Sequence, residues 1–320
     1  MKFVGHDGAW REWRAAMASE RMHHAWLVTG PRGLGKSAFA RAAASELVAE
    51  PGVHQPPLEQ HPDILVPEYP PESKEEARKR DEGKEYRVKR NIPISEIRAL
   101  QHRLVTRPTL GSRRAIIVDC ADDLEPSAVN ALLKSLEEPP AGTYFLLVSH
   151  QPGRLLPTIR SRCRILRLAP LDDEAVDALL RREAPSATAE TRAAAVAAAQ
   201  GSPAAALAFV NEDLAPLHAM MQRLVREGDP AFVLRGALAD ELGAKPDRKR
   251  LAAVFDLARS TLVEGLADAP RRRQAQIIEA HGAITRLAGQ APTFNFDPGL
   301  LIMEIGGLLA SAAMPTEAAS

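Results

Sequence analysis

Residues 30–37 have the spacing of a phosphate-binding loop, with the fixed positions filled by Gly30, Gly35, Lys36 and Ser37. In this pattern the backbone N–H groups of the loop surround a phosphate at a helix N-terminus. The lysine reaches the β- and γ-phosphates, and the serine hydroxyl ligates Mg²⁺. We include Gly33, inside the same loop, among the predicted nucleotide-binding residues. The pattern predicts nucleotide binding and does not by itself predict hydrolysis.

The segments on both sides of this loop agree with the pattern. Residues 25–28 are an apolar run that predicts a short buried strand, and residues 37–44 are alanine-rich and predict a helix. Strand, glycine loop and helix form the arrangement in which a phosphate is bound. A glycine-rich turn with a surface lysine is the alternative, and the two flanks disfavour it.

A phosphate loop needs an acidic residue at the end of a neighbouring strand to hold Mg²⁺. Asp119 follows the apolar run 115–118 directly, so we expect it at the carboxyl end of a strand, where ligands gather in open α/β sheets. An aspartate that caps the next turn is the alternative interpretation. ATPases of this type usually have a glutamate at the next position, and here that residue is Cys120. A thiol cannot replace the carboxylate as an efficient general base.

Two arginines, Arg160 and Arg162, stand shortly before the apolar run 164–168. A guanidinium can stabilise the charge on a transferring γ-phosphate. The separation from the loop in sequence does not show whether such an arginine acts on its own site. Solvation at the surface is the ordinary alternative for any single arginine.

The elements that must position these residues follow from the order of apolar runs. Strand-like runs occur at 115–118, 144–148 and 164–168. Residues 127–138 between them have an apolar face at helical spacing and end before Pro139. Strands that alternate with helices predict an α/β fold with a parallel sheet covered on both faces.

Beyond Pro170 the strand signals stop and only helical patterns continue. Short alanine-rich helices are expected first, and longer helices follow. We therefore predict three domains: a nucleotide-binding α/β domain at 1–169, a small helical domain at 170–211 and a helical C-terminal domain at 212–320.

The composition excludes several classes of protein. The chain has 41 Lys+Arg and 41 Asp+Glu, so its net charge of 0 disfavours a protein that coats DNA but allows a local basic face. Cys120 and Cys163 are the only cysteines, which excludes a disulfide framework and a four-cysteine zinc site. We see no signal peptide and no apolar run of membrane-spanning length, and we expect a soluble, cytoplasmic protein.

Residues 72–90 are a mixed-charge segment with almost nothing to bury. We interpret this segment as a solvated insertion, with a basic contact for nucleic acid as the alternative. The sequence leaves open whether it is ordered.

The run Asn-Ala-Leu-Leu-Lys-Ser-Leu-Glu-Glu-Pro-Pro at 130–140, followed by Ser-Arg-Cys at 161–163, resembles the clamp-loader subunits of bacterial DNA polymerase III, which belong to the AAA+ superfamily. His-Ala-Trp-Leu at 24–27, His-Pro-Asp at 61–63 and Ile-Ser-Glu-Ile-Arg at 94–98 are similar to that family as well. The resemblance is strong up to about residue 170 and moderate up to about 210.

The resemblance implies an AAA+ domain, a helical lid and a collar that closes a ring of five subunits. The implied partners are gamma/tau-like motor subunits, a delta-like subunit, the sliding clamp and primed DNA. In that family the Ser-Arg-Cys arginine, here Arg162, is an arginine finger that acts in trans on the ATP of a neighbouring subunit. The resemblance also implies that Arg98, Asn130 and Lys134 face the DNA backbone.

The sequence departs from the ATP-hydrolysing members of the family. Cys120 replaces the catalytic glutamate, and Ala204 replaces a lid arginine that senses the γ-phosphate. Ser149 or His150 stands at the first sensor position. Residues 48–62 contain no cysteine, so we expect no zinc.

We therefore expect a clamp-loader subunit that binds ATP or ADP with Mg²⁺, hydrolyses little or none and has no polymerase activity. An ATP-hydrolysing, gamma/tau-like motor subunit is the first alternative, and Cys120 and Ala204 disfavour it. A phosphate-loop kinase for a small molecule is the second alternative. It is disfavoured because no arginine-rich mobile lid lies near the loop and about 150 helical residues would have no role.

Overall fold

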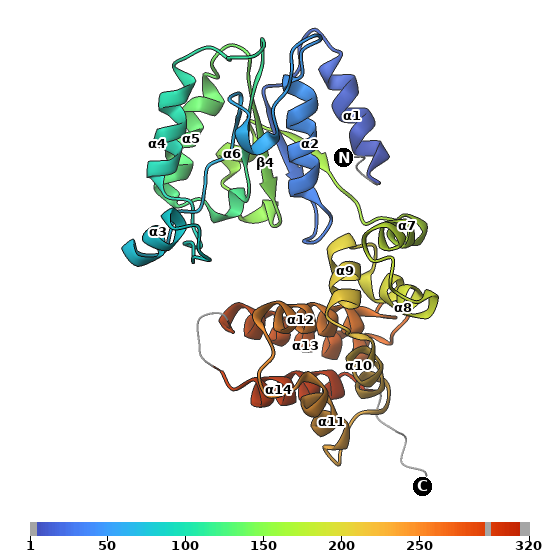
Figure 1. The fold of residues 1–320 in the computed structure, drawn as a ribbon. Coiled ribbons are helices and arrows are strands. Elements are labelled where there is room, and N and C mark those ends of the chain that lie inside the picture. Colours follow the sequence, from blue (N-terminus) through green and yellow to red (C-terminus); the bar gives the residue numbers. More distant parts are fainter. Residues whose placement is uncertain (1–4, 292–295, 314–320) are drawn as a thin grey trace. The chain divides into compact units, whose positions relative to one another are not determined.

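Figure 1 shows the computed structural model of the chain, which describes residues 5–291 and 296–313. The chain divides into two compact units, Met1–Ala169 and Pro170–Ser320. The first unit contains every strand of the described residues, and the second is helical.

The first unit is built on a parallel sheet of five strands in the order β2-β3-β4-β1-β5. The strands are β1 (Ala25–Thr29), β2 (Ile64–Leu65), β3 (Arg114–Val118), β4 (Thr143–Ser149) and β5 (Arg164–Arg167). Every residue of β1 and β3 is buried, which explains why both read as continuous apolar runs. The predicted parallel α/β sheet is confirmed.

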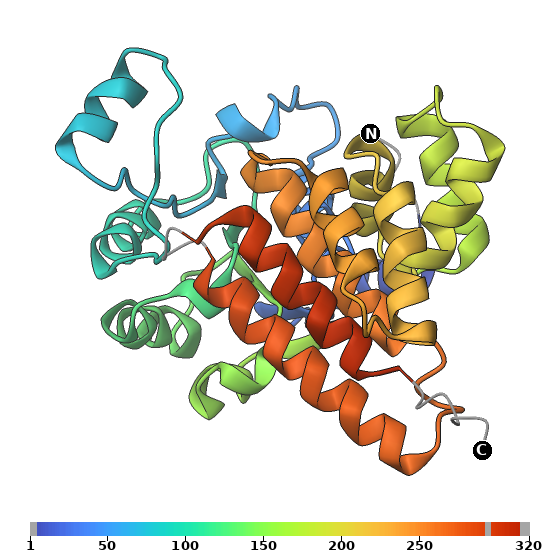
Figure 2. The same cartoon turned by 90° about the horizontal axis from the view of Figure 1, so that it is seen from below.

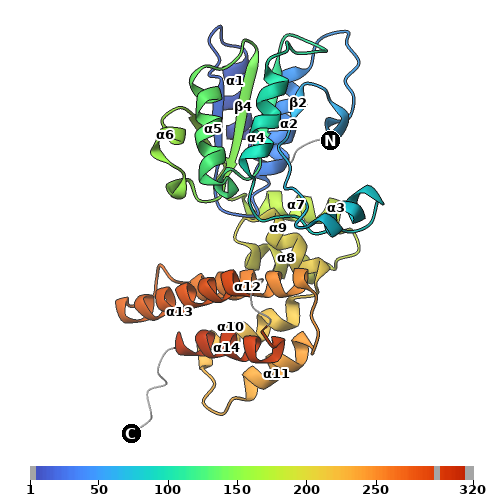
Figure 3. The same ribbon diagram turned by 90° about the vertical axis from the view of Figure 1, so that its left-hand side faces the viewer.

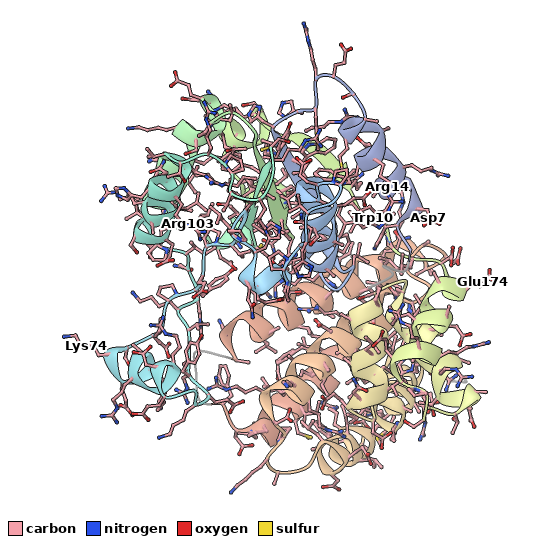
Figure 4. The ribbon with its side chains drawn as sticks, turned by 45° about the horizontal axis from the view of Figure 1, so that its top comes forward. Asp7, Trp10, Arg14, Lys74, Arg103 and Glu174 are labelled. Atoms are coloured by element: carbon pink, nitrogen blue, oxygen red, sulfur yellow. The ribbon has the colours of Figure 1, made fainter. Side chains whose placement is uncertain are left out.

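Helices cover the two faces of this sheet (Figure 1). They are α1 (Asp7–Met17) and α2 (Lys36–Val48) on one face, and α4 (Ile94–Leu104), α5 (Pro126–Glu137) and α6 (Pro157–Arg160) on the other. Short 3₁₀ turns span Leu58–Gln60, Ala121–Asp123 and Pro152–Arg154. Because strand side chains alternate between faces, Ile117 packs with the α1 and α2 side chains, whereas Ile116 packs with those of α4 and α5. Figure 4 shows Trp10 and Arg14 on α1, where the Trp10 ring packs at a tilt against Phe39 of α2 with ring centroids 4.5 Å apart.

The charged segment 72–90 contains a helix, α3 (Lys74–Asp81), that buries no residue. The Ser73 side chain caps this helix by accepting a hydrogen bond from the Glu76 N–H. The Glu76 carboxylate in turn accepts from Lys79 Nζ at 2.8 Å and from the Arg87 N–H at 2.6 Å. The segment is exposed to solvent as predicted, and local capping and ion pairing stabilise its helix without a buried face. The alternative, a basic contact for nucleic acid, stays a prediction. Figure 4 shows Lys74 at the start of α3, pointing away from the sheet.

The second unit is entirely helical over its described residues, as predicted. Its helices are α7 (Asp173–Glu183), α8 (Ala189–Ala199), α9 (Pro203–Asn211), α10 (Ala215–Glu227), α11 (Val233–Leu242), α12 (Arg248–Val263), α13 (Arg271–Gln290) and α14 (Pro298–Ser311). Figure 2 shows the later helices, in orange and red, packed side by side. One cluster of buried side chains runs from α7 to α14, and the predicted boundary near residue 211 stays a prediction. None of the described helices is long and apolar enough to cross a bilayer.

Candidate nucleotide site

The phosphate loop connects the carboxyl end of β1 to the first residue of α2. Gly30, Gly33 and Gly35 have φ angles of +146°, +81° and +79°, which favour glycine. A Cβ atom on Gly30 would lie 2.5 Å from the Leu168 carbonyl oxygen, so a side chain there would displace the backbone of the loop or of its neighbour. The predicted glycines are therefore required by the conformation of the loop, and α2 begins where a phosphate-binding helix should begin.

The Lys36 side chain is buried inside this loop. Its Nζ atom donates hydrogen bonds to the carbonyl oxygens of Gly30 at 2.7 Å and Pro31 at 2.5 Å. Burial lowers the pKa of Lys36, and the nearby Cys120 and Asp122 act in the opposite direction. The ammonium group is thus fixed where the loop would present it to a phosphate.

Ser37 and Asp119 lie next to each other although 82 residues separate them. The Ser37 hydroxyl donates to Asp119 Oδ1 at 3.0 Å, at the carboxyl end of β3. A hydroxyl and a carboxylate at one point supply the hard oxygen ligands that Mg²⁺ takes in phosphate-loop proteins. The residues present therefore fit a magnesium ion that also contacts nucleotide phosphates.

Asp122 accepts hydrogen bonds from several groups around Cys120, the residue that we predict to stand in place of a catalytic base. Its carboxylate accepts hydrogen bonds from Cys120 Sγ at 3.0 Å, Ser149 Oγ at 2.7 Å, the His150 N–H at 2.6 Å and the Gln151 N–H at 3.3 Å. Burial raises the pKa of the Cys120 thiol to about 12, and its hydrogen bond to Asp122 acts in the same direction. The Cys120 side chain is therefore an uncharged thiol that donates to a carboxylate.

The same hydrogen bonds control the charge of Asp122. Burial by itself would raise the pKa of this carboxyl, but the bonds from Cys120, Ser149 and the backbone N–H groups outweigh it and hold the pKa below the ordinary 3.8. Asp122 is consequently ionised at neutral pH and joins the ends of β3 and β4 through charge-assisted hydrogen bonds.

We expect Asp122→Asn to lower the free energy of unfolding at pH 7 by about 1–2 kcal/mol, because the amide keeps one acceptor oxygen but loses the charge. A carboxyl whose pKa is depressed by folding stabilises the protein above its unfolded pKa and loses that contribution as the pH falls through the folded pKa. The difference between wild type and variant should therefore be constant from about pH 7 to 5 and shrink below about pH 4. Denaturant unfolding measured across this range tests it, with the exposed Asp81→Asn as control. A difference that does not change with pH would contradict the assignment of the charge.

The two candidates for the first sensor position have different surroundings. Ser149 pairs with Thr29 across the β1–β4 ladder, and its hydroxyl is engaged by Asp122. The His150 imidazole lies close to Lys36 and Arg32, and burial and these two cations lower its pKa. Of the two side chains, His150 is therefore the one whose pKa is lowered by charged residues of the phosphate loop.

Arg162 lies at the edge of the sheet opposite the phosphate loop. β5 runs parallel to β1, with Arg164 at the start of β5 opposite Trp26 near the start of β1. Arg162 comes just before β5 and therefore lies at the amino ends of these strands. The phosphate loop follows the carboxyl end of β1. Three residues of strand separate the two ends, or about 10 Å. The structure therefore does not bring Arg162 together with Lys36, Ser37 and Asp119.

Two contacts hold Arg162 at the amino ends of β1 and β5, and its neighbour Cys163 packs against the core. The guanidinium forms an ion pair with Glu137 Oε1 at 2.6 Å and donates from Nη1 to the Thr158 carbonyl oxygen at 3.0 Å. The Cys163 side chain packs against the core under α4 and α5, and burial raises its pKa to about 12. In this motif the cysteine acts as a small apolar residue.

Arg98, Asn130 and Lys134 are all exposed, on the neighbouring helices α4 and α5. These helices lie side by side in Figure 3. Gln101 joins them by donating from Nε2 to the Ala131 carbonyl oxygen at 2.8 Å. The three predicted DNA-facing residues therefore share one pair of packed helices.

Ala204 belongs to the second unit, where it is exposed in the first turn of α9. The side chain of Ser202 caps that helix by accepting from the Ala205 N–H. A methyl group at position 204 offers no charge for a phosphate.

Three residues of this region escaped the sequence-based predictions. His6 Nε2 lies 2.8 Å from the Leu34 carbonyl oxygen and joins the segment before α1 to the phosphate loop. Tyr69 accepts from the Cys120 N–H at 2.9 Å and donates to Asp123 at 2.7 Å. Asp122 stands two positions after Cys120, and this spacing could have indicated its role from the sequence. Tyr69 lies in a proline-rich stretch, where no sequence pattern indicates its contacts.

The chain is similar to proteins of one replication family. The family model described as "DNA polymerase III, delta subunit" matches residues 5–172. DNA polymerase III subunit delta′ of Pseudomonas aeruginosa is 35% identical over 192 residues, which cover 56% of this chain and 53% of the relative. The delta′ subunit of Escherichia coli is 32% identical over 212 residues, 62% of this chain and 58% of that relative. The chain thus spans about half the length of these curated relatives.

More distant similarities involve other subunits. DNA polymerase III subunit tau of Salmonella typhimurium is 32% identical over 161 residues, which cover 49% of this chain and 23% of the relative. A solved structure of a DNA polymerase III gamma subunit-related protein from Thermotoga maritima is 20% identical, with a TM-score of 0.47, and covers 94% of this chain and 98% of that chain.

Proposed function

Because the chain belongs to the DNA polymerase III delta′ family of clamp-loader subunits, we propose that it is a delta-prime-like subunit that helps to load a sliding clamp onto primed DNA. In this proposal it binds nucleotide, hydrolyses it poorly and supplies an arginine to the ATP of a neighbouring subunit. The proposed partners are gamma/tau-like motor subunits, a delta-like subunit, the clamp and primed DNA. Residues 170–211 would serve as the lid and 212–320 as the collar.

One observation carries this proposal: a complete phosphate loop lies next to an incomplete catalytic centre. Lys36, Ser37 and Asp119 converge as nucleotide binding requires, whereas the position of the base holds the neutral Cys120 thiol. Binding energy without turnover stabilises the folded state by mass action. We infer that the loop is a nucleotide-stabilised structural element.

ATP or ADP with Mg²⁺ fits this site through the chain's own groups. Gly30, Gly33 and Gly35 let the loop approach the phosphates closely, and Lys36 supplies a positive charge. Ser37 and Asp119 would hold the magnesium ion, which neutralises phosphate charge when it is bound. Cys120 is not suited to take a proton from an attacking water, because its thiol is protonated and donates to Asp122.

The position of Arg162 supports a role in trans. A guanidinium at the sheet edge opposite the loop is too far away to contact the phosphates that the loop binds. It is partly exposed, as a contact with an adjacent subunit requires. In P-loop NTPases a guanidinium supplied in this way stabilises the charge that develops on the γ-phosphate.

The exposed Arg98, Asn130 and Lys134 are proposed contacts for the phosphate backbone of DNA. Contacts of this kind position a protein on a duplex and carry no sequence information, as a protein that loads clamps requires.

We expect the purified chain to bind ATP with Mg²⁺ and to hydrolyse it no faster than background, and Cys120→Glu to remain slow. The carboxylate of Asp122 lies 3.0 Å from Cys120 Sγ and would repel the new glutamate, and Ala204 supplies no compensating charge. Steady-state phosphate release with and without primed DNA tests both statements, with Cys120→Ser as the uncharged control. Rapid DNA-stimulated hydrolysis by the wild-type chain would instead favour a motor subunit.

A further inference from the structure

Arg162 is held by a carboxylate on the helix beside it. Arg162 Nη2 and Glu137 Oε1 are 2.6 Å apart, and Nη1 donates to the Thr158 carbonyl oxygen at 3.0 Å. Both amino ends of the guanidinium are therefore tied to the chain's own framework. The two side chains remain 34% and 49% exposed, so the pair lies at the surface and not in the core.

This arrangement leaves part of the guanidinium available. A guanidinium has five N–H groups, and these contacts engage only its two amino ends. Within the described residues no hydrogen bond uses Arg162 Nε, so that edge and the remaining amino hydrogens can be offered to another molecule. A planar guanidinium whose position is fixed by these two contacts can donate its remaining N–H groups to phosphate oxygens.

Glu137 is also well placed to hold a cation. It is the last residue of α5, where the carboxyl end of the helix dipole adds negative potential to the carboxylate. Its neighbour Glu138 is exposed and has no ion pair in the described part of the chain. Two adjacent glutamates thus differ in whether they touch Arg162.

We propose that Glu137 is the positioning residue of Arg162 and holds its guanidinium in the orientation that serves the nucleotide of the neighbouring subunit. The inference rests on the proposed role of Arg162 in trans. A side chain that is already oriented before the subunits meet loses less conformational entropy when it contacts the nucleotide. The orientation should therefore raise the rate of ATP hydrolysis in the assembled complex. Since α5 also carries Asn130 and Lys134, a shift of this helix would be passed to Arg162 through Glu137.

The test uses the complete clamp loader reconstituted with its motor subunits, the clamp and primed DNA. In this complex Glu137→Gln should lower the kcat for ATP at the site that Arg162 serves by roughly 2- to 5-fold, as expected for a partly exposed ion pair. The KM for ATP should not change, because the motor subunit binds the nucleotide. Glu137→Asp should recover part of the rate, and Glu138→Gln should leave it unchanged. The melting temperature of each variant should match that of the wild type.

A double-mutant cycle separates positioning from a general structural effect. If Glu137 acts through Arg162, adding Glu137→Gln to Arg162→Ala should cause no further loss of kcat. Additive losses, or a Glu137→Gln complex as fast as the wild type or faster, would overturn the inference. If Arg162→Ala is itself without effect, the proposed role in trans fails and the positioning role fails with it. An effect of Arg162→Ala without one of Glu137→Gln refutes the positioning role alone.

Discussion

Replacing Arg162 by alanine should slow ATP hydrolysis at the neighbouring motor site by about 1,000-fold, the lower end of the range for arginine fingers in P-loop NTPases. Nucleotide binding by this chain should not change, since Arg162 and the phosphate loop lie at opposite edges of the sheet. The fold should tolerate the change, because a partly exposed ion pair such as Arg162–Glu137 contributes at most about 1 kcal/mol. Single-turnover hydrolysis by the reconstituted complex measures the effect.

Arg160→Ala is the matched control for this experiment. Arg160 is exposed and ends α6 two residues before Arg162, so the substitution removes the same charge from almost the same place. Complexes with Arg160→Ala should hydrolyse ATP at the wild-type rate. An unchanged rate with Arg162→Ala would rule out the role in trans, and Arg162→Lys should recover little, because an ammonium lacks the planar fork.

Replacing Lys36 by alanine should weaken the binding of ATP to the isolated chain by about 30-fold or more, as expected when one partner of a buried charge pair is removed. The substitution removes the positive charge that the loop would offer to the phosphates, a charge that lies at the Gly30 and Pro31 carbonyl groups of the loop. Titration of the purified chain with a fluorescent ATP analogue gives the ratio of dissociation constants. Nucleotide-dependent thermal stabilisation should shrink in parallel.

Lys134→Ala controls for the loss of a lysine, because Lys134 is exposed on α5 and should not affect ATP binding. Clamp loading by a complex that contains Lys36→Ala should suffer less than when a motor subunit loses its equivalent lysine. If loading is abolished, nucleotide bound here takes part in the cycle and the loop is more than a structural element. Equal affinities of the wild type and Lys36→Ala for ATP would contradict the role that we assign to Lys36 in nucleotide binding.

The catalytic centre that we propose to be incomplete differs from an active one in more than the predicted absence of a glutamate. The thiol that replaces it donates to Asp122, and this carboxylate also engages the Ser149 hydroxyl and the His150 N–H. Hydrogen bonds that join the ends of β3 and β4 make this region part of the framework. A single substitution at Cys120 would therefore have to reorganise a charged network before an attacking water could be activated.

The sequence was informative wherever a property is local. The Gly30–Ser37 spacing, the buried run before Asp119 and the apolar face of α5 each depend on residues close together in the chain, and the structure confirms these elements. Periodicity also predicted the parallel sheet and the change to helices after Pro170. It did not predict the helix α3, because capping and ion pairs rather than apolar burial stabilise that helix.

What the sequence determined by itself was the identity of the chemical groups: a lysine and a serine predicted to bind a nucleotide, an aspartate predicted to hold magnesium, and a cysteine at the position where we predict that a base is absent. The tertiary structure decided which of these groups meet. The pairing of β1 with β4 and of β3 with β4 brings Ser37 to Asp119, and the register of β5 against β1 sends Arg162 to the opposite edge. Strand order and register arise from contacts between distant segments, so no local pattern encodes them.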